Sequence, residues 1–161
     1  MNAIVAVDEN WGIGRNGQLL ARISADLRRF KALTTGHAVI LGRKTLQTFP
    51  GGRPLPGREN LIMSTTMDAA PEGAKVFHDL DRLLDYAPED AFVIGGETVY
   101  RELLPYCGKA YVTKIHQTFD ADAFFPALDD LDGWKVTETE GPFEENGVAF
   151  SYVTYEREDG R

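Results

Sequence analysis

The stretch that decides the fold is FVIGGETVY, residues 92–100, in which a buried-strand pattern stops at two glycines and restarts at once as a helix. Gly95 and Gly96 allow the backbone to come close to an anion because neither residue carries a Cβ, and the helix that follows points its positive end at the same place. The junction therefore indicates contact with a phosphate, as in a bound nucleotide. It matches neither the G-x-G-x-x-G fingerprint nor a P-loop. The alternative is a strand-to-helix turn that only requires small residues.

A second junction of this kind lies earlier in the chain, where a predicted strand ends at Leu41 and Gly42-Arg43-Lys44-Thr45 begins a short helix. Two cations at a helix N-terminus oppose the helix dipole, an arrangement that favours an anion between them. A third strand end offers the hydroxyl groups of Ser64 and Thr65 and no acid. Hydroxyl groups with an arginine nearby suit a 2′-phosphate, so NADP is favoured over NAD.

The order of apolar patterns around these junctions predicts the architecture. Runs rich in β-branched and aromatic residues predict eight strands, at residues 2–7, 37–41, 60–64, 75–77, 91–95, 109–115, 134–139 and 148–156. Helical patterns lie between the early strands, at residues 24–35, 43–48, 80–86 and 98–104. We therefore expect a single α/β domain over residues 1–161, with a predominantly parallel eight-stranded sheet flanked by about four helices. An antiparallel C-terminal hairpin, joined through residues 141–147, would complete the sheet.

Composition narrows the function classes. The net charge of −8 makes nucleic acid an improbable partner, while the nine Lys/Arg and four Asp/Glu of residues 1–60 are compatible with a small anionic ligand. No apolar run is long enough to cross a membrane, and the single cysteine fits a reducing cytoplasm. The three histidines lie on separate elements without the spacing of metal ligands, so no metal site is expected. We expect a monomer, because no segment signals an interface.

Among the acidic residues, Asp26 is the one that a purely structural role explains least well. At about 100° per residue, it falls near the middle of a helical apolar stripe formed by Ile23, Leu27, Phe30 and Leu33, whereas the cations Arg28, Arg29 and Lys31 point away. A buried acid is costly without a partner, so we expect Asp26 to bind a cationic or protonated group and to have a raised pKa until that group arrives. The alternative is that Asp26, two residues after Ser24 as the N-cap, complements the helix dipole.

Five motifs together resemble the bacterial dihydrofolate reductase family over essentially the whole chain. They are Gly12-Ile13-Gly14, Ser24-Ala25-Asp26-Leu27-x-x-Phe30-Lys31, Leu41-Gly42-Arg43-Lys44-Thr45, Arg53-Pro54-Leu55-Pro56-Gly57-Arg58-x-Asn60 and Val93-Ile94-Gly95-Gly96-x-x-Val99-Tyr100. The resemblance implies that NADPH, which becomes NADP, gives its C4 hydride to C6 of dihydrofolate while N5 is protonated. The product would be tetrahydrofolate for one-carbon and thymidylate metabolism, and antifolates would be possible inhibitors.

The resemblance also implies roles for individual residues. Asp26 would bond N3 and the 2-amino group of the pterin, Thr113 would steady that carboxylate, and Arg58 would pair with the α-carboxylate of the substrate's glutamate. The folate pocket would be lined by Ile4, Ala6, Leu27, Phe30, Phe49, Leu55 and Ile94. The cofactor would contact Ala6, Ile13, Gly14, Gly42, Arg43, Lys44, Thr45, Ser64, Thr65, Gly95, Gly96, Glu97, Thr98, Val99 and Tyr100. Residues 8–23 would be a mobile loop over the nicotinamide, contacted by Asp122 of a later loop.

One departure from the family pattern lies in that loop. Leu20-Ala21-Arg22 stands where most members have a Pro-Trp pair followed by a short polar residue, and Ser24 replaces a common proline. In the family the indole shields the nicotinamide and orders a water near the acid. Ala21 therefore predicts a wetter or wider site, with hydride transfer retained and with altered substrate affinity or inhibitor response.

Two other functions stay open on the sequence alone. A reductase of the same architecture in riboflavin synthesis would keep the two NADP junctions, but it would not need Asp26, Phe30 and Arg58 together. A catalytically silent NADP-binding module is conceivable because of Ala21. Loss of reduced-nicotinamide absorbance that depends on dihydrofolate would support the dihydrofolate reductase against both, whereas NADPH binding without turnover would favour the silent module.

Overall fold

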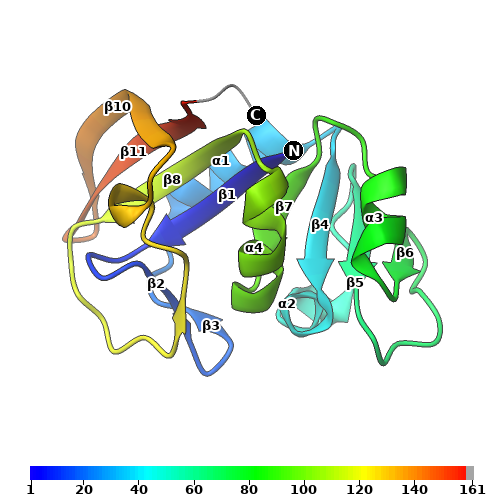
Figure 1. Ribbon diagram of the computed structural model, residues 1–161. Helices are drawn as coiled ribbons and strands as arrows, with labels where there is room; N and C mark the ends of the chain where they lie inside the picture. Colours follow the sequence, from blue (N-terminus) through cyan, green and yellow to red (C-terminus); the bar gives the residue numbers. More distant parts are fainter. Residues whose placement is uncertain (159–161) are drawn as a thin grey trace.

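The computed structural model describes residues 1–158 and has an eight-stranded sheet with helices on both of its faces (Figure 1). The strand order is β10-β11-β8-β1-β7-β4-β5-β6. The strands are β1 (Asn2–Val7), β4 (Ala38–Gly42), β5 (Glu59–Met63), β6 (Ala74–Phe77), β7 (Phe92–Gly95), β8 (Lys109–Ile115), β10 (Trp134–Glu145) and β11 (Val148–Arg157). All pairs from β6 to β8 are parallel, whereas β11 is antiparallel to both β8 and β10. The predicted fold class is confirmed.

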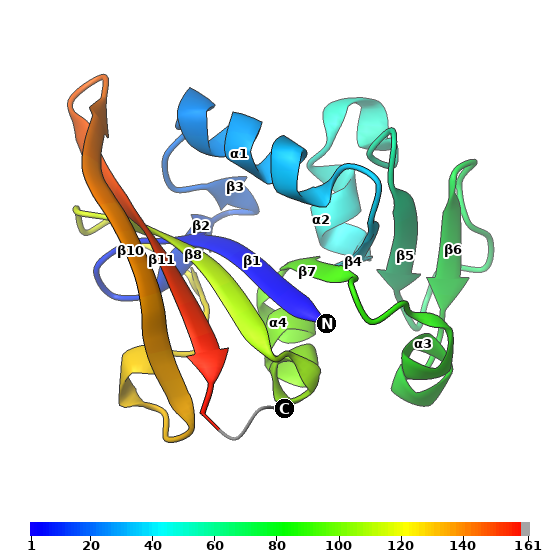
Figure 2. The ribbon, with the colours of Figure 1, turned by 90° about the horizontal axis from the view of Figure 1, so that it is seen from above.

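Two helices cover each face of the sheet. Figure 2 shows α1 (Ser24–Thr34) and α2 (Arg43–Gln47) over one face, and α3 (Leu80–Tyr86) and α4 (Glu97–Leu103) over the other. Short 3-10 turns follow at η1 (Pro50–Gly52), η2 (Leu104–Tyr106) and η3 (Leu128–Asp130). Neighbouring strand residues point to opposite faces, so Val39 and Leu41 of β4 pack on the α1 side, while Ala38 and Ile40 pack on the α4 side. The sequence patterns predicted all four helices to within one residue at either end.

A second, smaller sheet was not predicted. It joins β2 (Gly12–Arg15) to β3 (Gln18–Leu19) and to β9 (Ala123–Phe124), which lies more than a hundred residues away in the chain. These strands have two to four residues and little hydrophobic alternation. The two-residue periodicity that identifies a strand in a sequence is therefore missing. The segment 8–23, for which no strand was predicted, is therefore partly a hairpin paired to a later loop.

The closing hairpin is longer than predicted. β10 continues to Glu145, so the connection is only Asn146-Gly147, both with positive φ (52° and 80°), rather than residues 141–147. Gly141-Pro142 reads as a turn in the sequence, but here it interrupts the register within an edge strand, where proline is tolerated. An antiparallel hairpin with one buried face should alternate apolar and polar residues, but burial does not alternate along β10. After Trp134 this edge strand is exposed almost throughout.

Candidate active site

The centre of the site is a hydrogen bond between α1 and β8. Thr113 is buried, and its Oγ1 donates to Oδ1 of the half-buried Asp26 at 2.5 Å. Strand alternation explains the meeting, because Thr113 shares the α1-facing side of β8 with Tyr111, and its register partner on β1 is Ala6. Asp26 therefore faces the sheet rather than solvent, as its place in the apolar stripe predicted.

Burial raises the pKa of Asp26 above its ordinary value of 3.8, while the hydrogen bond from Thr113 and the positive charge of Arg29 partly oppose the shift. The carboxyl thus takes up a proton at a higher pH than an exposed aspartate would. A group that is desolvated, held by one hydrogen bond and titrating above its normal range is well suited to binding a protonated ligand.

Two details of α1 differ from the prediction. Ser24 is not the N-cap: Ile23 holds that position without a side-chain bond, and the carboxylate of Glu145 accepts the backbone N–H of Ser24 at 2.7 Å and of Ala25 at 3.1 Å. Arg29 does not point away. It is half-buried, with its guanidinium 4.0 Å from the ring centroid of Tyr152 on β11. Both corrections arise from the closing hairpin, whose position next to α1 no local pattern shows.

An apolar wall stands beside the carboxyl. Phe30 of α1, Phe49, Leu55 and Ile94 are partly buried and pack against one cluster that includes Ile4 of β1. The structure thus brings together five residues predicted for the folate pocket. Two others lie apart from this cluster: Ala6 packs with Ala21 and Ala25 around Ile23, Ile115 and Phe150, and Leu27 is half-buried outside both clusters.

Arg58 is held in a defined orientation near the end of α1. Its Nε donates to the carbonyl of Pro56 at 2.9 Å, and its Nη1 donates to Oγ1 of Thr34 at 3.1 Å. Burial lowers the pKa of Arg58. The buried side chain of Asn60 braces the same turn, because it accepts the N–H of Leu55 and donates to the carbonyls of Leu55 and Arg58, each at 2.9 Å. Sequence reasoning assigned no role to Asn60, although a polar residue beginning a buried strand was a signal.

The two glycine junctions meet in space. β4 and β7 are parallel neighbours with Leu41 opposite Gly95, so their C-terminal ends lie together. A Cβ on Gly42 would lie 3.2 Å from Val99, and one on Gly96 would lie 3.4 Å from Oγ1 of Thr45. A larger side chain at either Gly42 or Gly96 would therefore crowd the other junction. This bare backbone, beside the cations that begin α2, fits a ligand bearing phosphate groups.

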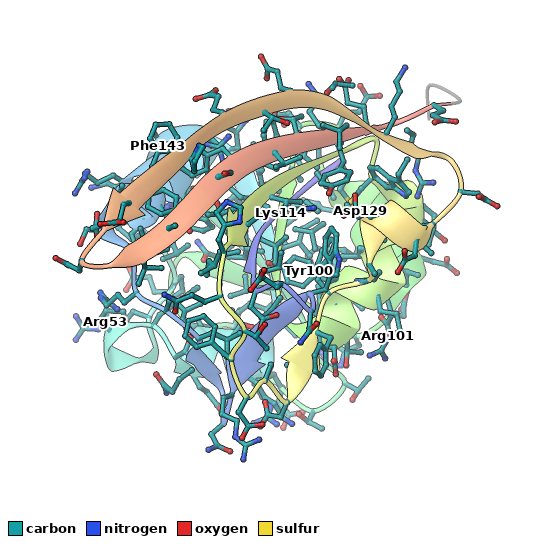
Figure 3. The ribbon with its side chains drawn as sticks, turned by 90° about the vertical axis from the view of Figure 1, so that its left-hand side faces the viewer. Arg53, Tyr100, Arg101, Lys114, Asp129 and Phe143 are labelled. Carbon is teal, nitrogen blue, oxygen red and sulfur yellow. The ribbon has the colours of Figure 1, made fainter. Side chains whose placement is uncertain are left out.

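The remaining residues predicted for the cofactor lie in varied surroundings. Ser64 Oγ accepts the N–H groups of Thr66 and Met67, while Thr65 and Thr98 are exposed. Glu97 accepts the N–H of Phe124 at 2.7 Å, which ties α4 to β9. Val99 and Tyr100 are buried, and the Tyr100 hydroxyl donates to the carbonyl of Ile4 at 2.7 Å; Figure 3 labels this tyrosine. The side chains of Val99 and Tyr100 thus belong to the core.

The segment after β1 is docked against the later loop. Oδ2 of Asp122 accepts the N–H of Asn16 at 3.0 Å, and the N–H of Asp122 donates to the carbonyl of Gly14 at 2.9 Å. The buried carboxylate of Asp8 accepts the N–H of Gly12 at 2.7 Å and of Phe119 at 2.9 Å. The expected contact of Asp122 with this segment is present. Asp8, which joins the same two loops, was missed because an acid next to glycines reads as an ordinary turn.

Two negative findings concern the described residues 1–158. None of their helices is long and apolar enough to cross a membrane. Within the same range, no three His, Cys, Asp or Glu side chains lie close enough together to hold a metal ion.

Comparisons with known proteins agree with this geometry. The sequence profile of the family described as "Dihydrofolate reductase" matches residues 1–157. The chain is 38% identical to the dihydrofolate reductase of Bacillus subtilis, covering 97% of this chain and 94% of that one. It is 40% identical to the dihydrofolate reductase of Mycobacterium leprae, covering 90% of each chain. A solved dihydrofolate reductase from Enterococcus faecalis, complexed with NADP(H) and RAB-propyl, superimposes with a TM-score of 0.87 at 37% identity, covering 98% of this chain and 96% of that one. The chain therefore belongs to the dihydrofolate reductase family of NADP-dependent oxidoreductases.

Proposed function

We propose that this protein reduces 7,8-dihydrofolate to 5,6,7,8-tetrahydrofolate with NADPH, and that Asp26 and Thr113 form its catalytic pair. The observation that carries the proposal is the desolvated carboxyl of Asp26, bonded to Thr113 at 2.5 Å on the sheet face that α1 covers. A dihydropterin needs such a group, because it must gain a proton at N5 when it accepts a hydride at C6.

Asp26 binds and orients the pterin. A carboxylate presents two oxygens, which match the two N–H donors at N3 and the 2-amino group. Thr113 bonds Oδ1 and so fixes the plane of the carboxyl. Bound NADPH supplies the hydride from C4 of its nicotinamide. Because the pKa of Asp26 is raised by burial, the site holds a proton near the pterin at a pH where an exposed aspartate would have lost it.

The rest of the substrate follows the apolar wall. Phe30, Phe49, Leu55 and Ile94 offer a surface for the flat aromatic part of the folate, and Ile4, Ala6 and Leu27 complete the proposed pocket. Arg58 pairs with the α-carboxylate of the glutamate. Its guanidinium is already oriented by Pro56 and Thr34, so little side-chain freedom is lost on binding.

The cofactor occupies the joined glycine junctions. We assign its diphosphate to the backbone of Gly95 and Gly96 together with the start of α2, where Gly42 and Thr45 lie against α4. Its 2′-phosphate is assigned to Arg43 and Lys44 with the hydroxyls of Ser64 and Thr65. Ile13, Gly14 and residues 97–100 complete the proposed cofactor set.

The two rival functions are not favoured. A riboflavin-pathway reductase of the same fold has no use for a pocket that combines Asp26, Phe30 and Arg58. A silent NADP-binding module would not require the desolvated, hydrogen-bonded acid, since burial of Asp26 has a free-energy cost that the bond from Thr113 and the charge of Arg29 offset only in part.

The test is a direct assay. Purified protein with NADPH is expected to lose reduced-nicotinamide absorbance only when dihydrofolate is added, and tetrahydrofolate should accumulate in equal amount. Protein that binds NADPH, as followed by fluorescence, but gives no dihydrofolate-dependent loss would overturn the assignment. The matched control is Asp26→Asn, which keeps the shape of the site and removes the charge.

We further propose that the protein acts in the cytoplasm as a monomer and that antifolates compete with dihydrofolate at the same pocket. The buried free thiol of Cys107, whose pKa burial raises to about 11, suits a reducing compartment. Sedimentation equilibrium at assay concentration tests the monomer. Competition between an antifolate and dihydrofolate at saturating NADPH tests the shared pocket.

A further inference from the structure

Arg29 is a half-buried cation of the helix that carries the catalytic acid. It follows Asp26 by three residues, a spacing that places both side chains on the same side of α1. Arg29 is half-buried, whereas its neighbours Arg28 and Lys31 are exposed. A half-buried guanidinium between two exposed cations indicates that a partner holds it.

That partner is the ring of Tyr152. The Arg29 guanidinium carbon lies 4.0 Å from the ring centroid, within the range of a cation–π interaction. The rings of Phe143 and Phe150 pack against Tyr152 with centroids 5.5 and 5.6 Å away, and Figure 3 labels Phe143 on the outer strand of the hairpin. The aromatic cluster therefore fixes the platform on which Arg29 lies.

The platform is adjacent to the catalytic pair. Tyr152 of β11 is the register partner of Thr113 of β8, and Thr113 is in turn the partner of Ala6 of β1. Ala6, Thr113 and Tyr152 thus form a row across the sheet beneath α1. The guanidinium lies over the end of this row, one strand away from the hydroxyl that bonds Asp26.

We propose that Arg29, held over the Tyr152 ring on the same side of α1 as Asp26, is a positioning residue for Asp26, and that its charge sets the pH range over which the hydride step operates. This inference rests on the proposed catalytic role of Asp26. The sequence of this chain alone gave Arg29 no function.

The other groups around the acid identify Arg29 as the charge that matters. Thr113 donates a hydrogen bond, and the phenols of Tyr100 and Tyr152 are neutral because burial raises the pKa of both. Of the surrounding charges, Glu140 of β10 raises the pKa of Tyr152, whereas Arg28 of α1 lowers it. Arg29 opposes the effect of burial by favouring the ionised carboxylate, so its loss is expected to raise the pKa of Asp26 further.

Loss of the Arg29 charge is expected to shift the pH profile of the hydride step in one direction. The reaction consumes a proton, so the hydride step is fast when the site is protonated and slows as pH rises past the ionisation of the site. Removing the cation stabilises the protonated site, and the midpoint of the pH profile moves to higher pH. A purely structural residue would lower the rate or the stability without moving that midpoint.

The experiment measures single-turnover hydride transfer from pH 5 to 9 with saturating NADPH and dihydrofolate. For Arg29→Met we expect the midpoint to rise by roughly half to one pH unit, and the rate above both midpoints to be about three- to tenfold higher. Arg29→Lys keeps the charge and should stay near the parent midpoint. Arg28→Met, which removes an exposed cation of the same helix, is the matched control.

Two outcomes overturn the inference: an unchanged midpoint in Arg29→Met, or an equal shift in Arg28→Met. If Arg29→Met does not fold, as judged by thermal unfolding, Arg29→Gln replaces it with the same expectation. Tyr152→Phe preserves the platform and should leave the midpoint in place. Failure of the proposed function is distinguishable, since the parent protein would then show no dihydrofolate-dependent oxidation of NADPH at any pH.

Discussion

The carboxylate of Glu145 accepts the backbone N–H of Ser24 at 2.7 Å, although the two residues are 121 positions apart in the chain. Glu145 also accepts the N–H of Ala25, so the turn end of the closing hairpin satisfies the first donors of the helix that carries Asp26. Proline, which is common in the family at the position of Ser24, has no N–H to give. The departure at Ser24 thus makes this bond possible.

The bond predicts a pH-dependent contribution to stability. Its two backbone donors lower the pKa of Glu145 below the ordinary 4.5, so the contribution is complete above that value and is lost as pH falls through the lowered pKa. Glu145→Gln should therefore lower the melting temperature at neutral pH, and the gap to the parent should close in acid. Glu144→Gln, the exposed neighbour, is the control. A gap that stays constant down to pH 3 would contradict the ionic cap.

Asp26→Asn should separate charge from shape at the catalytic pair. Thr113 can still donate to the amide oxygen, but the protonated pterin loses its counter-charge. We expect the hydride step to fall by about 10²- to 10⁴-fold near neutral pH and to recover partly at low pH, where solution protonates the substrate. Stopped-flow pH profiles measure this. An unaffected rate would return Asp26 to the role of a dipole partner in α1.

Arg58→Leu should weaken the binding of dihydrofolate and leave the binding of NADPH unchanged. Loss of a charge-assisted bidentate pair corresponds to about 1.5–3 kcal/mol, or roughly ten- to a hundredfold in the KM for dihydrofolate. The dissociation constant of NADPH should not change, because the two glycine junctions lie at the C-terminal ends of β4 and β7, whereas Arg58 lies just before the start of β5. Arg53→Leu removes an exposed arginine of the same turn and should leave KM near the parent value. Equal effects of the two variants would argue against a specific carboxylate contact.

Gly95→Ala should weaken both folding and cofactor binding. Gly95 has a φ of 127°, and an added Cβ would lie 3.3 Å from the ring of Tyr100. We expect a loss of about 1–3 kcal/mol in urea unfolding and a higher dissociation constant for NADPH. Gly73→Ala is the control, because Gly73 also has a positive φ, 87°, but nothing lies within 4 Å of its Cβ position. Equal losses of unfolding free energy and of NADPH affinity in Gly95→Ala and Gly73→Ala would show that backbone strain alone is responsible.

Ala21→Trp should restore the indole that most family members have. Ala21 is half-buried and packs with Ala6 and Ala25, so a large ring there narrows the space above the pterin side of the sheet. Hydride transfer should persist, while the affinity for dihydrofolate and for antifolates should change. The measurements are steady-state kinetics and antifolate titration. No change in either would refute the idea that Ala21 widens the site.

Several features followed from the sequence because their causes are local. The strand–glycine–helix junctions at residues 41–45 and 94–98 are encoded by apolar runs, missing side chains and helix starts within a few residues of one another. The acid on the inner face of α1 followed from helical periodicity alone, since Asp26 falls within a stripe that must pack on the sheet. The resemblance to the family then predicted Thr113 as the partner of Asp26 and Arg58 as the partner of the substrate's glutamate.

Other features depend on contacts between distant segments, which no local period encodes. The two glycine junctions became one surface only because β4 and β7 are neighbours in the sheet, so that Gly96 reaches Thr45. Likewise, helical periodicity predicts that Arg29 points away from the apolar stripe, but β11 brings the Tyr152 ring beneath its guanidinium.

The sequence by itself thus determined the α/β class, the strand–glycine–helix junctions and the acid on the inner face of α1, because periodicity and backbone freedom act over a few residues. Tertiary structure alone decided which side chains surround that acid. The register of β11 on β8 and the docking of the hairpin on α1 put Glu145 and Arg29 in place, and the contacts of Glu145 with Ser24 and of Arg29 with Tyr152 each join residues more than a hundred positions apart.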